Sequence, residues 1–220
     1  RLQARHFGFL TRDGLRWPQG DVTLAWRERE RAAGDTAPVQ GGEFSAQRLD
    51  LGLMAQVAAG LPLDATARRW LDELAPQGIV TTLSSRWDGP IEAPAKYEVR
   101  AQLSGLTVAA GAVPPEAPAG TPGRPGLRNA SLELQASERG GQARIGIGGG
   151  ALELPGVFDE ATLPLDRLAA QLSWRITPTK STPAAPALEV KLAEAEFANA
   201  DMRGEFAATW RSDGTPGSLG

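Results

Sequence analysis

Residues 50–87 read DLGLMAQVAAGLPLDATARRWLDELAPQGIVTTLSSRW and carry the one clear helical pattern in the sequence. Asp50 suits the N-cap of a first helix, which Gly60 ends. Asp64 suits the N-cap of a second helix, and Pro76 and Gly78 end that helix. At 1.5 Å per residue each helix is about 15 Å long, too short to be stable alone. Both helices therefore have to pack on an apolar surface that the rest of the chain supplies.

The second helix has a stripe of large apolar side chains. Trp70, Leu71 and Leu74 recur at helical spacing. An exposed stripe of this kind would promote aggregation, so we expect all three side chains to be buried against strands.

The remainder of the chain alternates between apolar and polar residues, which predicts half-buried strands with one wet face. The 26 glycines and 17 prolines indicate many turns between these strands. One such turn is expected at residues 148–150, between two short strands. The sequence thus predicts a mainly β fold: an elongated, twisted and curved antiparallel sheet, groove-like, with two short helices within residues 50–76.

The domain organisation follows from one stretch rich in proline and glycine. Residues 111–126 suit neither a helix nor a strand ladder, so we expect a long surface loop there, mobile and dispensable for folding. Residues 1–110 form strands with the inserted helical pair, and residues 127–220 form an antiparallel meander that continues the same sheet. The chain begins without methionine and has no run of about 18 apolar residues, and we expect it to be a segment of a longer protein.

Twelve apolar positions in the second half of the chain should share one face of this meander, because they alternate along successive strands. They are the candidate ligand-contacting residues: Leu132, Leu134, Ile145, Ile147, Leu152, Leu154, Leu172, Trp174, Ile176, Leu188, Val190 and Leu192.

Composition argues against most catalytic and nucleic-acid functions. The net charge of −3 lacks the basic excess that nucleic-acid binding requires. There is no cysteine, and His6 is the single histidine. The residues that zinc sites and Ser-His or Cys-His catalysis require are therefore almost absent. Residues 146–151 (GIGGGA) match a dinucleotide fingerprint, but a strand-like LELP follows where a helix is needed. We predict no catalytic residue, no metal and no cofactor.

Four predicted strands end in a tryptophan beside an arginine: Trp26-Arg27, Arg86-Trp87, Trp174-Arg175 and Trp210-Arg211. Two interpretations remain open. Each tryptophan either plugs the end of an apolar strip, which we favour, or stacks against a ligand.

The order of several short segments resembles the central region of the YhdP-like proteins, relatives of the AsmA and TamB group of Gram-negative bacteria. The segments are residues 42–46 (GEFSA), 49–51 (LDL), 61–63 (LPL), 74–78 (LAPQG), 86–89 (RWDG), 125–130 (PGLRNA), 149–155 (GGALELP) and 197–201 (FANAD). The resemblance implies a periplasmic body, with an inner-membrane anchor outside this segment. It also implies phospholipid movement to the outer membrane in support of its permeability barrier. The partners implied are phospholipid acyl chains and adjoining segments of the same long chain. The family has no catalytic motif to carry over to this sequence.

Alternation of period two fits an open groove and a closed sandwich equally well. The leading prediction is a lipid-conduit segment. The alternatives are a non-catalytic β-sandwich module that binds protein or glycan, and a structural spacer.

Overall fold

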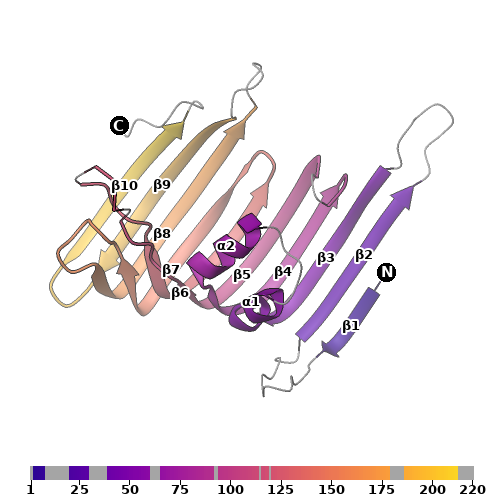
Figure 1. Cartoon of the computed structure of the whole chain (residues 1–220), viewed down its shortest axis with the longest axis horizontal. Coiled ribbons are helices and arrows are strands. Elements are labelled where there is room, and N and C mark those ends of the chain that lie inside the picture. Colours follow the sequence, from indigo (N-terminus) through magenta and orange to yellow (C-terminus); the bar gives the residue numbers. More distant parts are fainter. Residues whose placement is uncertain are drawn as a thin grey trace.

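The computed structural model describes residues 2–7, 20–29, 39–59, 65–91, 94–113, 115–118, 120–178 and 186–212, and every statement below concerns these ranges. They form one ten-stranded sheet with two helices (Figure 1). The strands are β1 (Leu2–Phe7), β2 (Gly20–Arg29), β3 (Val39–Asp50), β4 (Gln77–Asp88), β5 (Lys96–Val108), β6 (Gly126–Ser137), β7 (Gly140–Glu153), β8 (Thr162–Thr177), β9 (Ala187–Ala198) and β10 (Arg203–Ser212).

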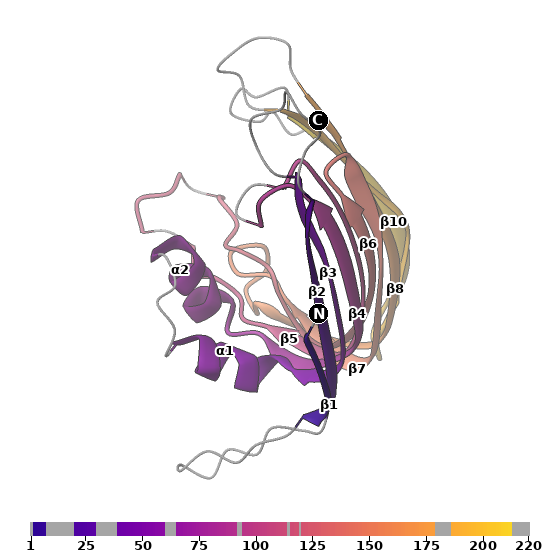
Figure 2. The same cartoon turned by 90° about the vertical axis from the view of Figure 1, so that its right-hand side faces the viewer.

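The sheet is an antiparallel meander in which each strand pairs with the next one in the sequence. Strands β1 and β10 therefore form the two edges, as Figure 1 shows. Figure 2 shows the sheet bowed along its strands and open, with no second sheet over it in the described part of the chain. The predicted mainly β fold with a curved antiparallel sheet is confirmed, and the closed-sandwich alternative is wrong.

Helices α1 (Leu51–Ala59) and α2 (Ala65–Leu74) come between β3 and β4 in the sequence. They lie on the inner side of the bow, at one end of the strands (Figures 1 and 2). Asp50 caps α1 as predicted, because its carboxylate accepts a hydrogen bond of 3.0 Å from the backbone N–H of Leu53. After α2 the N–H of Ala75 donates to the carbonyl of Leu71 before Pro76 ends the helix.

The helix pair is attached to the sheet mainly through α1. Leu51 packs against both buried apolar clusters of the sheet. One cluster contains Ala46, Leu49 and Val80; the other contains Leu106, Ala130, Ile147, Leu165 and Leu168. Leu71 and Leu74 of α2 are half-buried, but Trp70 is 49% exposed. The expectation that Trp70 is buried is wrong, because α1 rather than α2 supplies the contact with the strands.

The predicted turn at residues 148–150 is also wrong, since β7 runs unbroken from Gly140 to Glu153. Gly149 has a φ of +67°, and the opposite residue Asn129 of β6 has a φ of +56°. The pairing of β6 with β7 shifts at this point, as at a β-bulge. The Asn129 amide donates to the carbonyls of Gly148 and Gly149, which satisfies groups that the interrupted ladder leaves open.

The loop between β5 and β6, at residues 109–125, is bonded to α2. Arg124 donates to the carboxylate of Glu73 at 2.9 Å and to the Glu73 carbonyl at 2.6 Å. The loop also joins its own two halves, because the N–H of Gly111 donates to the carbonyl of Arg124. These bonds hold the loop against α2 and close its base; that the loop is dispensable for folding stays a prediction.

Candidate functional site: an apolar face and its two ends

The strand register collects the apolar side chains on one face of the sheet. Residues directly opposite one another in antiparallel strands point to the same face. One continuous row crosses eight strands and contains only apolar residues: Val22, Ala46, Leu83, Ala101, Leu134, Ala143, Leu172 and Leu192. We call the face that carries this row the apolar face. Leu51 of α1 packs on it, so the helices cover the same face.

Coverage of the apolar face is uneven along the strands. Toward the helices its residues are buried, with Leu165 at 2% and Ile147 at 3% exposure. Away from the helices several of its large side chains are only half-buried, as at Leu134, Leu172 and Val190, although Trp87 is buried there. The end of the sheet with the helices is termed the helix end; the opposite end, where β2–β3, β4–β5, β6–β7 and β8–β9 connect, is termed the hairpin end.

Eleven of the twelve candidate residues follow this division. Ile147 belongs to a buried cluster, and Leu132, Ile145 and Leu152 pack against it. The others are half-buried and lie nearer the hairpin end: Leu134, Leu172, Trp174, Ile176, Leu188, Val190 and Leu192. Leu172 lies opposite Leu192, Trp174 opposite Val190, and Ile176 opposite Leu188.

Leu154 is the exception. Strand β7 ends at Glu153, and the backbone N–H of Leu154 donates to the carbonyl of Ala161. Leu154 therefore lies in the β7–β8 connection rather than on a strand of the apolar face.

The first half of the chain contributes to the same face, and the candidate set omitted it. Phe44, Leu83, Val99 and Ala101 are half-buried members of its rows. Their alternation was visible in the sequence, but it did not reveal that the strands before residue 110 and after residue 126 pair directly. Strand β5 is bonded to β6 over eight residue pairs, which makes the two halves one surface.

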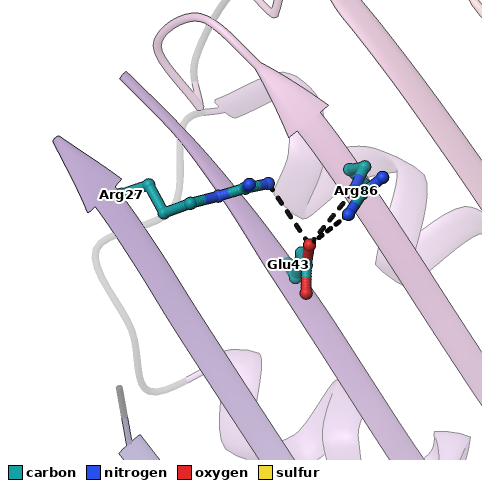
Figure 3. A network of polar contacts seen from close by, with 3 residues as sticks. All are labelled: Arg27, Glu43 and Arg86. Carbon is teal, nitrogen blue, oxygen red and sulfur yellow. Dashed lines mark hydrogen bonds and ion pairs between the residues drawn. The ribbon is translucent and has the colours of Figure 1, made fainter. Parts of the chain in front are cut away.

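The opposite face is polar. At its hairpin end Glu43 of β3 accepts hydrogen bonds from Arg27 of β2 at 3.2 Å and from Arg86 of β4 at 2.6 Å (Figure 3). The hydrogen bond to Glu43 and its negative charge raise the pKa of Arg86. A depression of about 530 Å³ is lined by polar side chains, including Gln47, Arg100, Gln135 and Arg144. Residues of the apolar row lie between these polar residues along the strands. This face is exposed to solvent, and several of its charged side chains form ion pairs.

Aromatic side chains gather on the apolar face at the hairpin end. Trp26, Gly42, Trp87 and Tyr97 are aligned across β2 to β5, and Trp26 meets Trp87 edge-on with ring centroids 6.1 Å apart. Across β8 to β10, Trp174, Val190 and Trp210 are aligned. We call Trp26, Trp87, Tyr97, Trp174 and Trp210 the aromatic rim. Trp87 is buried and fits the plug interpretation, whereas the other four are half-buried or exposed.

The described residues contain no candidate metal-binding cluster. Within those ranges no three histidine, aspartate or glutamate side chains are grouped to hold a metal ion. The side chain of His6 lies outside the described part of the structure. No helix among the described residues is both long enough and apolar enough to cross a bilayer.

Comparison with known proteins gives one match. The family model described as YhdP protein matches residues 1–219, which is nearly the whole chain. No curated protein and no solved structure matches the chain. The match agrees with the segments that carry the resemblance in the sequence. The chain belongs to the YhdP family.

Proposed function

We propose that this chain is a non-catalytic segment of a lipid-transport protein of the cell envelope, and that its apolar face shields the acyl chains of phospholipids. Membership of the YhdP family supports an AsmA-like role related to lipid transport. The observation that carries the proposal is the half-buried part of the apolar face. Rows of leucine and valine at Leu134, Leu172 and Val190 remain partly open to solvent although the chain is folded.

The energetics suit such a role. Each methylene group removed from water contributes about 0.8 kcal/mol, so a chain of about 16 carbons costs roughly 12 kcal/mol to expose. A conduit has to offset most of this cost at every position along its length. A continuous apolar row across eight strands does so without enclosing the lipid, because the sheet is open.

The location and the remaining partners follow from the same proposal. The segment lies in the periplasm of a Gram-negative bacterium, as part of a protein that is anchored in the inner membrane outside this segment. It supports the permeability barrier of the outer membrane. Adjoining segments of the same long chain pair with the edge strands β1 and β10, each of which has one strand neighbour among the described residues.

Lipid occupancy and transfer test the proposal. The chain, expressed in the periplasm of a Gram-negative host and purified, should carry phospholipid in native mass spectrometry and move fluorescent phospholipid between vesicles. Val190→Asp places a charge on the open part of the apolar face and should abolish both signals while the melting temperature falls little. Lys191→Asp, one residue away on the polar face, is the matched control and should leave both signals intact. A folded protein without lipid in either assay would support the spacer alternative.

A further inference from the structure

The aromatic rim and the helix end make the two ends of the apolar face chemically different. At the helix end, α1 covers the face through Leu51, and the loop bonded to α2 lies beside it. Near the hairpin end the apolar face carries the tryptophan and tyrosine side chains of the aromatic rim, and on β8 and β9 the pair Ile176 and Leu188 lies beyond them. Tryptophan and tyrosine are enriched where an apolar environment meets water, because their rings are apolar and their N–H or O–H groups are polar.

Each member of the aromatic rim has a basic residue beside it in the sequence. The pairs are Trp26-Arg27, Arg86-Trp87, Lys96-Tyr97, Trp174-Arg175 and Trp210-Arg211. Since neighbouring residues of a strand point to opposite faces, each basic side chain lies behind its aromatic ring. Arg175 is exposed and forms no ion pair with any side chain that the structure describes. Arg27 and Arg86 are paired with Glu43, and Arg211 with Glu189, so Arg175 is the basic side chain that the hairpin end offers to a phosphate.

A hydrogen-bond donor at the rim lacks an acceptor. The indole Nε1 of Trp87 is buried, and no acceptor lies within hydrogen-bond distance of it among the described residues. A buried N–H without an acceptor is unusual and unfavourable. Trp26 lies against Trp87 and is itself 43% exposed, so a shift of its ring would open this donor to a ligand carbonyl.

The length of the apolar face along the strands matches one acyl chain. Trp174 at the rim and Leu168 in the buried cluster are six residues apart on β8, which corresponds to about 20 Å at 3.3 Å per residue. The hydrocarbon of one bilayer leaflet is about 15 Å thick, half of the bilayer core of about 30 Å. An acyl chain aligned with the strands therefore fits between the rim and the helix end.

We infer that phospholipids bind this face in one orientation, with the acyl chains along the strands toward the helix end and the glycerol esters and phosphate at the aromatic rim. The inference rests on the proposed function. Ester carbonyls meet the indole and phenol groups of the rim, and the phosphate lies near Arg175. Lipids then move across the strands, from one edge of the sheet to the other, with every headgroup on the same side.

Two photoreactive phosphatidylethanolamine probes test this orientation on the unmodified chain. One carries a diazirine on the headgroup amine, and the other carries it at the end of an acyl chain. After irradiation and proteolysis, the headgroup probe should label peptides of the hairpin end, around Tyr97 and Trp174. The acyl probe should label peptides nearer the helix end, around Ile147 and Leu168. Equal or reversed labelling by the two probes would overturn the orientation while leaving lipid binding in place. Absence of labelling by both probes would overturn the proposed function as well.

A matched pair of variants tests the phosphate contact. Arg175→Gln removes a basic side chain at the hairpin end, and Arg203→Gln removes one from β10 at the helix end. A basic side chain close to anionic lipid contributes enough to change affinity about fivefold. Arg175→Gln should weaken binding of short-chain phosphatidylglycerol by about that factor at low salt, and Arg203→Gln should not. Equal effects of the two substitutions would contradict headgroup binding at the rim.

Discussion

Gly42 of β3 lies directly under the indole ring of Trp87 on β4. The two residues are opposite one another in the ladder, and a methyl group on Gly42 would overlap the six-membered part of the ring. Gly141 and Trp174 repeat this relationship between β7 and β8. Glycine at these two positions is what allows each ring to lie flat across its neighbouring strand.

Gly42→Ala should therefore displace Trp87 and destabilise the fold by about 1–3 kcal/mol, the usual cost of overpacking. Urea denaturation followed by tryptophan fluorescence measures the change. Gly148→Ala is the control, because nothing lies within 4 Å of a Cβ at that position. Equal stability of the two variants would mean that the ring is free to move.

Leu51→Ala should cost about 2 kcal/mol, the low end for leucine truncation, because the side chain is half-buried but contacts both apolar clusters. It should also raise the protease sensitivity of the α1–α2 region, since Leu51 is the attachment of the helix pair to the sheet. Met54→Ala on the exposed side of α1 provides the comparison and should change stability by less than about 0.5 kcal/mol.

Arg124→Ala should release the β5–β6 loop from α2 with little loss of global stability. Exposed ion pairs contribute about 0–1 kcal/mol, and this pair is only partly buried. Hydrogen exchange is the sensitive readout, because the N–H groups of Ala109 and Gly111 are bonded to Leu74 and Arg124. Both amides should exchange faster in the variant. Unchanged exchange would show that the backbone alone holds the loop in place.

Glu189 should contribute stability that is lost in acid. The hydrogen bond from Arg211 lowers the pKa of Glu189 below its ordinary 4.5, and Lys191 adds to the effect. The folded state thus favours the carboxylate, so the contribution is present at neutral pH and disappears as the pH falls from about 4.5 through the lowered pKa. The stability difference between the native chain and Glu189→Gln should shrink over that range.

The sequence predicted the face of each strand well wherever alternation was unbroken. Leu172, Trp174 and Ile176 lie on the apolar face because β8 keeps a strict period of two there. Prediction failed where a single residue breaks the period. The glycine run at residues 148–150 signals a turn, but the bulge at Gly149 and Asn129 keeps β7 continuous. After the bulge, Leu152 packs against the buried cluster. Nothing local in the sequence distinguishes these two outcomes.

Trp70 shows a second limit. Its helical spacing with Leu71 and Leu74 predicts an apolar stripe, but spacing does not specify whether another element covers the stripe. Coverage depends on where α1 attaches, and that depends on the packing of Leu51 between clusters drawn from β3 to β8. Long-range packing of this kind has no signature within a helix.

The central claim, that the open part of the apolar face binds acyl chains, is tested most directly by crosslinking from two adjacent residues. A photoreactive amino acid at Leu172 projects from the apolar face, and the same residue at Ser173 projects from the polar face of the same strand. In the periplasm of a Gram-negative host, the Leu172 position should crosslink phospholipid, and the Ser173 position should not. A folded chain that crosslinks phospholipid equally from both positions, or from neither, would contradict the account.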